Sequence, residues 1–179
     1  MNLEVHKDLI ENSKRGDARS QYELYKLYSR AMYNTCYRMM NSIEDAEDVL
    51  QESFSDAFRK LHTFVYHSTF GAWLKRIIVN NCINELKKKK PELEFCEELP
   101  PSLPEEQETK GLGVDQIKKA MTQLPEGSRL IFSLYLLEGY DHREIASILK
   151  VSESNSKSQY MRAKRRIKVI LEGEMNDEE

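Results

Sequence analysis

Hydrophobic side chains recur at three- and four-residue steps along most of this chain, the spacing that places them on one face of an α-helix. The stripes continue, with interruptions, from near the N-terminus almost to the C-terminus. The pattern therefore predicts an all-α fold. The expected helices span residues 3–15, 19–40, 42–61, 70–90, 114–124, 128–137 and 141–149, and a last, long helix starts at residue 153.

Prolines divide this pattern into two parts. Residues 1–90 contain no Pro, four of the five prolines fall between Pro91 and Pro104, and the fifth is Pro125. Residues 91–112 are also acidic and lack a hydrophobic period, which is the composition of an extended linker. We therefore expect two small helical domains, 1–90 and 113–172, joined by an acidic, proline-containing linker at 91–112 and followed by an acidic tail at 173–179. The second domain should be a four-helix unit.

Charge is unevenly distributed, although the net charge is only −3. Six basic side chains lie between Lys75 and Lys90, and six more lie between residues 153 and 170. The linker between these blocks carries seven Glu against the single cation Lys110. The chain therefore reads basic, acidic, basic, and the average conceals two candidate surfaces for an anionic partner.

The helix expected at Ser42–Leu61 differs from both blocks, because it carries six carboxylates between residues 44 and 56 and no basic side chain there. Ser42 can act as its N-cap, and the acids that follow suit the positive end of the helix dipole. Helical spacing places Asp48, Gln51 and Glu52 together, away from the apolar stripe. Two interpretations stay open: a solvated acidic face, or a face that binds a partner.

Residues 62–70, HTFVYHSTF, are rich in aromatic and hydroxyl groups and lack a period, so we expect a loop. The helix that follows turns Trp73 and several aliphatic side chains inward and leaves basic and amide groups outside. Cations neutralise phosphates and aromatic rings stack on unpaired bases, so the combination is typical of single-stranded nucleic-acid binding. A solvated, Lys-rich helix end that favours the helix dipole is the alternative.

Residues 141–170 show the pattern of a helix-turn-helix, with a short helix, a tight turn around Val151 and a long helix capped by Ser152. On the outer side of the long helix, hydroxyl and amide groups come first and cations follow. The front therefore suits base edges in the major groove, and the later cations suit phosphates. Lys150 stands where Gly is usual and Ser156 where an apolar residue is usual. A solvated basic helix packed on a core is the alternative.

Cysteine usage and missing motifs narrow the function. Cys36, Cys82 and Cys96 are odd in number and form no C-x-x-C pair, which fits a reducing compartment; the first two lie in apolar stripes and should be buried. No apolar run suits an export signal or a membrane span, so we expect a cytoplasmic protein. Because phosphate-binding loops, zinc-protease motifs and nucleophile elbows are absent from the sequence, and its four His are scattered, we expect neither an enzyme nor a cofactor or metal site.

The order of these parts resembles the bacterial RNA polymerase sigma factors of the sigma-70 family, in the small two-domain extracytoplasmic-function group. Their core-polymerase-binding helix is similar to DAEDVLQESF (Asp45–Phe54), and their promoter-melting, minus-10-reading helix is similar to WLKRIIVNNCIN (Trp73–Asn84). Their minus-35-reading helix-turn-helix is similar to EIASILKVS (Glu144–Ser152) with SKSQYMRAKRRI (Ser156–Ile167).

The resemblance implies a transcription initiation factor that binds core RNA polymerase, directs it to promoters and melts the minus-10 region, without catalysis of its own. It also implies an anti-sigma factor as a partner, and no insertion into a membrane. The implied contacts with the clamp helices of the largest catalytic subunit are Asp45, Asp48, Gln51, Glu52, Phe54 and Phe58.

The implied promoter contacts fall in two sets. Single-stranded minus-10 DNA would meet Phe64, Tyr66, Ser68, Lys75, Arg76, Asn80, Asn84, Lys87 and Lys88. Duplex minus-35 DNA would meet Ser154, Asn155, Lys157, Ser158, Gln159, Arg162, Arg165 and Lys168. Three of these depart from the family's usual residues, with Asn84 for Asp, Lys87 for Arg and Gln159 for a frequent Arg, so the promoter sequence does not follow from the resemblance.

Two further functions stay open at this point. A conventional helix-turn-helix regulator would use the C-terminal domain alone, but it leaves the N-terminal domain unexplained, and the acidic face would repel DNA. An adaptor could bind an anti-sigma protein without initiating transcription, although the two basic blocks argue against it.

Overall fold

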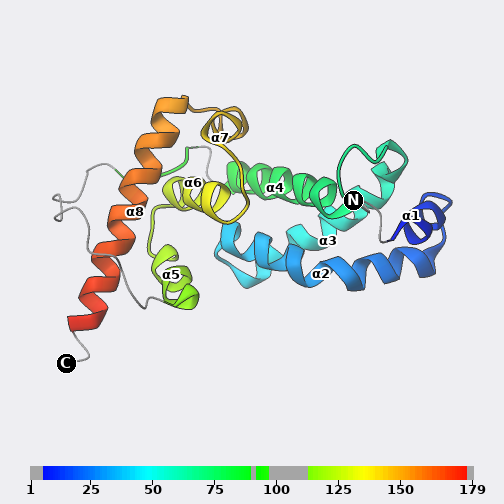
Figure 1. Cartoon of the computed structure of the whole chain (residues 1–179), viewed down its shortest axis with the longest axis horizontal. Helices are drawn as coiled ribbons and strands as arrows, with labels where there is room; N and C mark the ends of the chain where they lie inside the picture. The colour runs from blue at the N-terminus through cyan, green and yellow to red at the C-terminus, as the bar shows by residue number, and fades with distance from the viewer. Residues whose placement is uncertain (1–5, 90–91, 97–112, 177–179) are drawn as a thin grey trace. The chain divides into compact units, whose positions relative to one another are not determined.

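The computed structural model describes residues 6–89, 92–96 and 113–176. Within these ranges the chain forms eight α-helices and one 3-10 turn and no strand. It divides into two compact units, Met1–Lys89 and Lys90–Glu179 (Figure 1). The predicted all-α fold with two domains is confirmed. None of the described helices combines the length and apolarity needed to cross a bilayer.

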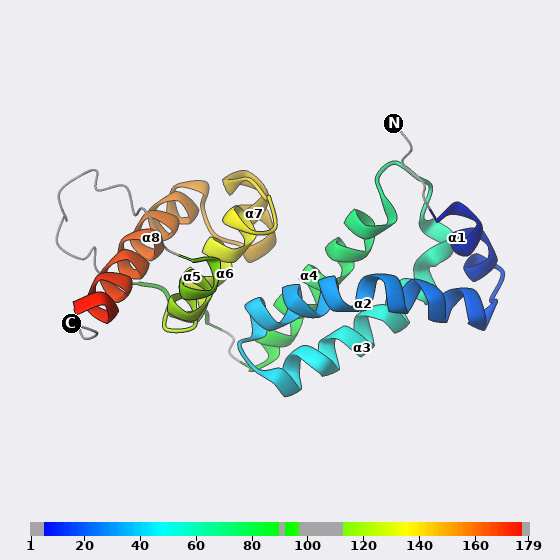
Figure 2. The same cartoon turned by 60° about the horizontal axis from the view of Figure 1, so that its bottom comes forward.

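The N-terminal unit contains α1 (Lys7–Lys14), α2 (Ala18–Met40), α3 (Ile43–Lys60) and α4 (Phe70–Lys89), with the 3-10 turn η1 (Leu61–Thr63) after α3. Helices α2, α3 and α4 each pack against the other two, and α1 packs on α2 (Figures 1 and 2).

Side-chain caps start two of these helices, one of them at the expected Ser42. The Asp17 carboxylate accepts a hydrogen bond from the Ser20 N–H at 2.8 Å, and Ser42 Oγ accepts one from the Asp45 N–H at 3.3 Å. Between α2 and α3, Asn41 adopts the left-handed conformation with φ 55°. Because Asn tolerates that conformation better than most residues, α2 can end there and α3 can turn back along it.

The core of this unit lies where α2, α3 and α4 meet, and its side chains are the apolar stripes of the sequence. Cys36 and Cys82 are fully buried free thiols, as the stripes predicted. Many other side chains in this core are at most 3 % exposed, and these include Leu24, Met39, Ala46, Val49, Phe54, Leu74, Ile78 and Val79.

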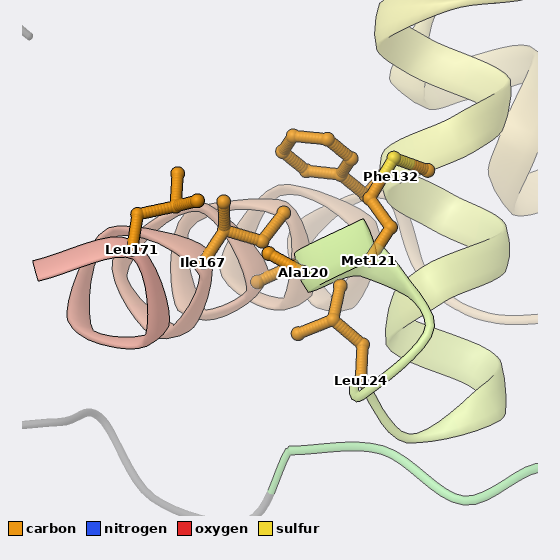
Figure 3. Close-up of a cluster of buried hydrophobic side chains, with 7 residues drawn as sticks. Ala120, Met121, Leu124, Phe132, Ile167 and Leu171 are labelled. Carbon is orange, nitrogen blue, oxygen red and sulfur yellow. The ribbon is translucent and has the colours of Figure 1, made fainter. Parts of the chain in front are cut away.

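The C-terminal unit contains the four expected helices, α5 (Val114–Met121), α6 (Glu126–Leu136), α7 (His142–Leu149) and α8 (Glu153–Asn176). The second half of α8 faces α5 and α6, where Ile167 and Leu171 lie close to Met121, Leu124 and Phe132 (Figure 3). This cluster leaves the first half of α8 to pack against α7 and forms the support of the helix-turn-helix.

Several boundaries differ from the expected ones. Helix α1 begins at Lys7 and α5 ends at Met121, so residues 122–124 form a turn before Pro125. Helix α8 continues to Asn176, into the expected tail. Residues 92–96 of the expected linker lie against the C-terminal unit, whereas residues 97–112 are outside the described residues.

Candidate functional site

The outer face of α3 presents the acidic and amide groups together. Asp48 lies about one helical turn before the adjacent Gln51 and Glu52, and all three are exposed, while the opposite side of α3 carries the buried Ala46, Val49 and Leu50. Gln51 also borders a hollow of about 440 Å³ between α2 and α3, which Tyr25, Arg30, Tyr33 and Glu47 help to line. The acidic face is therefore continuous with a recess that a partner side chain could enter.

Three other residues expected on this surface are placed differently. Phe54 is only 3 % exposed and contacts Tyr25 edge-on, with ring centroids 4.8 Å apart, so the expectation of a direct partner contact is corrected to a core role. Phe58 beside it is half-buried. Asp45 pairs with Lys89 at the end of α4, and this hydrogen bond raises the pKa of Lys89. Asp45 is thus engaged within its own unit.

The aromatic loop has a packed floor, formed by the buried rings of Phe64 and Phe70, whereas His62 and His67 are exposed. Phe64 is 2 % exposed, with its ring 5.4 Å from Trp73 and 5.9 Å from Phe70. The expected base contact at Phe64 is therefore corrected: its ring fills the floor of the loop. Ser68 is half-buried, and its hydroxyl donates to the Thr69 carbonyl at 3.3 Å.

Tyr66 ties the loop to α1. Its hydroxyl donates to Glu11 Oε1, and Lys14 Nζ lies 4.7 Å from the centre of its ring. The hydrogen bond from Tyr66 is the largest cause of the lowered pKa of Glu11. Tyr66 also adopts φ 62°, a left-handed conformation that is costly for a bulky residue and that these contacts hold in place.

Helix α4 gathers most of the expected minus-10 residues on one face. Arg76, Asn80 and Asn84 are exposed and Lys87 is half-buried, at three- and four-residue steps. Lys88 is exposed at the border of this face and forms an ion pair with Glu85 at 3.2 Å. Lys75 is half-buried and lies about 100° around the helix from Arg76, so it is separated from the other cations.

A polar contact fixes α4 against the acidic helix. Asn81 Nδ2 donates to Ser53 Oγ at 3.1 Å and to Asp56 Oδ2 at 3.3 Å. Ser53 is fully buried, so the Asn81 amide supplies a partner for a hydroxyl that water cannot reach. The acidic face of α3 and the basic face of α4 therefore belong to one packed unit and keep a fixed relation.

The turn of the helix-turn-helix accommodates both unusual residues. Lys150 takes the left-handed conformation with φ 60°, where Gly is usual, and the Val151 N–H donates to the Ala146 carbonyl at 3.1 Å. Ser156 is fully buried, and its hydroxyl lies 2.9 Å from His142 Nδ1. His142 thus supplies the partner that a buried hydroxyl needs.

His142 sits in an aromatic setting. Its ring stacks on Tyr135 with centroids 4.4 Å apart, and Tyr160 closes the group. Burial is the main cause that lowers the pKa of His142, and the nearby Lys157 lowers it further. The sequence pattern did not predict this role of His142. Ser156 stands at a position that is usually apolar, and a buried hydroxyl there indicates that a polar partner is needed.

The front of α8 carries most of the expected minus-35 residues on its outer side. Ser154, Lys157 and Ser158 are exposed, and Asn155, Arg165 and Lys168 are half-exposed. Ser152 caps the helix through the Asn155 N–H at 3.0 Å, as expected. Lys157 pairs with Glu153 at 2.7 Å, and Lys168 with Glu172 at 3.7 Å.

Two of the expected minus-35 residues hold contacts inside the protein. Gln159 is only 4 % exposed: its Oε1 accepts from Ser128 Oγ at 2.9 Å, so the expected base contact is corrected to a buried bridge. Arg162 donates from Nη1 to the Cys96 carbonyl at 2.8 Å. Ser128 and Cys96 lie far from α8 in the sequence, so a pattern of neighbouring residues cannot predict these contacts.

Metal chemistry finds no support in the described part of the chain. No group of three or more His, Cys, Asp or Glu side chains there is arranged to hold an ion. The cysteines at 36, 82 and 96 are free thiols.

Comparison with known proteins identifies both units. Residues 24–92 match the family model of sigma-70 region 2, and residues 115–167 match that of sigma-70, region 4. The chain is 31 % identical over 160 residues to the ECF RNA polymerase sigma factor SigM of Bacillus subtilis, covering 87 % of this chain and 98 % of that protein. It is 26 % identical over 179 residues to SigW of the same organism, covering 92 % of this chain and 96 % of SigW.

Solved structures share the fold. The sigma factor RpoE from Bartonella quintana, solved in complex with the anti-sigma factor NepR, superposes with a TM-score of 0.57 at 22 % identity, over 84 % of this chain and 96 % of that one. CnrH, solved in complex with the cytosolic domain of CnrY, gives a TM-score of 0.54 at 19 % identity, over 92 % of this chain and 96 % of CnrH.

Proposed function

The chain belongs to the sigma-70 family, as a transcription initiation sigma factor of the extracytoplasmic-function group, and on this premise we propose which of its surfaces meet the polymerase and the promoter. Sigma factors bind core RNA polymerase and promoter DNA, and as a family they are not enzymes. The chain is proposed to act in the cytoplasm, where the polymerase works.

The exposed face of Asp48, Gln51 and Glu52 on α3 is proposed to dock on the clamp helices of the largest catalytic subunit. An acidic face repels DNA but attracts a basic protein surface, and charge complementarity speeds the encounter and fixes its register. Phe54 and Phe58 support this face from beneath, through the ring contact of Phe54 with Tyr25. Asp45 takes part only after its ion pair with Lys89 is exchanged.

The face of Arg76, Asn80, Asn84 and Lys87 on α4 is proposed to hold single-stranded minus-10 DNA. Cations there would neutralise phosphates, and the two Asn amides would meet the edges of unstacked bases. Tyr66 and Ser68 in the loop are proposed to border the pocket of a flipped base, on the floor that Phe64 fills.

The front of α8 is proposed to read the duplex minus-35 element. Ser154, Asn155 and Ser158 lie where a recognition helix meets base edges, and Lys157, Lys164, Arg165 and Lys168 suit phosphates. The fold alone links the chain to RpoE and CnrH, whose structures hold NepR and CnrY. We extend the proposal to an anti-sigma partner of this chain on that basis.

The observation that carries the proposal is the fixed pairing of α3 with α4. Asn81 joins the two helices through Ser53 and Asp56, so an acidic protein-binding face and a basic strand-binding face move as one body. A factor that places polymerase on a melted strand needs that coupling. A conventional helix-turn-helix regulator has no use for it.

The test compares two double variants in full-length protein. Asp48→Ala with Gln51→Ala removes one carboxylate and one amide from the exposed face of α3, and Asp8→Ala with Asn12→Ala removes the same groups from the exposed side of α1. Two interfacial polar contacts of about 0.5–1 kcal/mol each predict core-polymerase binding weakened by about 5- to 30-fold for the α3 variant. The α1 variant should bind as the parent chain does.

Two measurements check the function itself. Run-off transcription with purified core polymerase should start at promoters when the parent chain is added, and duplex DNA affinity should stay the same in the α3 variant. If the parent chain, the α3 variant and the α1 variant bind core polymerase equally well, the proposed docking face on α3 is wrong. Failure of the folded parent chain to support any initiation would contradict the proposed assignment as a whole.

A further inference from the structure

A short piece of the chain, which starts at the last residue of the region 2 match, lies on the C-terminal unit. Residues 92–96, ELEFC, run past the start of α6 and the side of α8. The Gly127 N–H donates to the Glu94 carbonyl at 2.7 Å, and the Cys96 N–H donates to Ser128 Oγ at 2.8 Å. The Cys96 carbonyl accepts from Arg162 Nη1 at 2.8 Å and from Gln159 Nε2 at 3.3 Å. We call residues 92–96 the docked segment.

The site that receives the docked segment is shaped for a peptide backbone. Gly127 is the second residue of α6, where backbone N–H groups have no partner inside the helix, and the Glu94 carbonyl supplies one. A Cβ at position 127 would lie 2.5 Å from the Phe95 ring and 2.7 Å from the Glu94 carbonyl oxygen. Glycine therefore allows the segment to approach α6 this closely.

The docked segment also holds two residues of α8 that the family resemblance assigns to promoter DNA. Ser128 accepts from the Cys96 N–H and donates to Gln159 Oε1, so Gln159 lies in a chain of hydrogen bonds that ends on the segment. The Arg162 guanidinium donates a hydrogen bond to the Cys96 carbonyl, and it would have to give up this bond to reach a phosphate or a base with the same group. While Arg162 is hydrogen-bonded to the Cys96 carbonyl, its guanidinium is less available to DNA than it would be after the segment is released.

We propose that the docked segment is an intramolecular latch that withholds Arg162 from duplex DNA, so that release of residues 92–96 strengthens minus-35 binding. The inference rests on the proposed role of α8. Docked and DNA-bound arrangements compete for the same guanidinium, and the apparent affinity for duplex falls with the fraction of docked molecules. If about nine molecules in ten are docked, release raises the affinity about tenfold.

The test is Gly127→Ala in the full chain. Gly127 is helical and outside the left-handed region, so Ala suits its backbone and favours α6, while the added methyl expels the segment. Phe95→Ala removes the ring from the segment side. Gly173→Ala is the matched control. Gly173 lies on α8, the same helix as Arg162, and a Cβ at position 173 has no other heavy atom within 4 Å.

Two readouts separate docking from DNA binding. Hydrogen exchange of the Cys96 amide reports docking without DNA, and it should be slow in the parent chain and in Gly173→Ala and fast in the other two variants. Fluorescence anisotropy with a short random-sequence duplex reports affinity, which should rise about tenfold in Gly127→Ala and in Phe95→Ala.

Three results would overturn the latch. Fast exchange of the Cys96 amide in the parent chain would show that the segment is not docked. Unchanged or weaker duplex binding after release would show that the segment supports Arg162 and does not withhold it. If neither the parent nor the released variants bind duplex, the role of α8 in DNA binding fails and the latch fails with it, and slow Cys96 exchange in the parent would distinguish that case from a missing docked segment.

Discussion

Replacing Arg165 by Ala tests the proposed contact of α8 with DNA phosphates, and a neighbouring residue of identical chemistry, Arg166, provides the comparison. Lys157, Lys164, Arg165 and Lys168 fall within an arc of about 100° on the outer side of the helix, at 100° per residue. Arg166 is exposed but lies about 100° further around than Arg165. Arg166→Ala therefore removes the same charge from outside this arc and is the control.

The expected change in duplex affinity and in its salt dependence follows from the release of counterions from DNA. Four phosphate contacts predict that the logarithm of the duplex affinity falls with the logarithm of salt concentration with a slope of about −3.6, and loss of one contact brings the slope to about −2.7. Each contact also contributes a factor of about eight at 0.1 M salt relative to 1 M. Arg165→Ala should therefore weaken binding by roughly that factor at low salt and by much less at high salt.

Anisotropy titrations of the full chain against one labelled duplex at several salt concentrations measure both quantities. Arg166→Ala should keep the parental slope. Identical slopes for the two variants would contradict the assignment of the outer arc of α8 to phosphates, and a uniform loss of affinity without a change in slope would point to a contact with a base.

Two further predictions concern the supports of these surfaces. Ser42→Ala should lower the free energy of unfolding of the N-terminal unit by about 1 kcal/mol in urea denaturation, because the Asp45 N–H loses its cap, and exposed Ser55→Ala in the middle of α3 should show no such loss. Burial lowers the pKa of His142 below its unfolded value of about 6.5, so the unfolded chain binds the proton more readily and stability falls as pH drops below that value. His142→Gln should reduce this loss between about pH 7 and pH 5, and an unaltered pH profile would exclude His142 as its source.

Periodicity predicted the helices well because most of their stability comes from apolar faces that the sequence displays directly. The Ser42 and Asp17 caps were predictable for the same reason, since the cap and the N–H groups that it serves are three residues apart. The apolar stripe of α3 already contained Phe54, so its burial agrees with the period, and the resemblance alone placed it at the surface.

The remaining features depend on contacts between residues that are distant in the chain. Gln159 became a buried bridge because Ser128 and Cys96 come to it from elsewhere in the fold. The Ser156 hydroxyl is tolerated in the core because His142 reaches it from α7. The composition of residues 92–96 predicted a linker. Composition cannot predict that the missing side chain of Gly127 leaves room for the Phe95 ring against α6.

Several residues proposed to bind partners share one property in this structure: each already holds a contact inside the protein. Asp45 is paired with Lys89, Tyr66 with Glu11, Lys157 with Glu153, and Arg162 with the Cys96 carbonyl. When a partner binds at these positions, a polar contact inside the protein is exchanged for one with the partner. The net gain in binding free energy at each position is therefore small compared with the strength of the new contact alone. Affinity for polymerase or promoter must then come from many such exchanges made together. A complex assembled in this way forms specifically and also releases readily, which suits a dissociable specificity subunit.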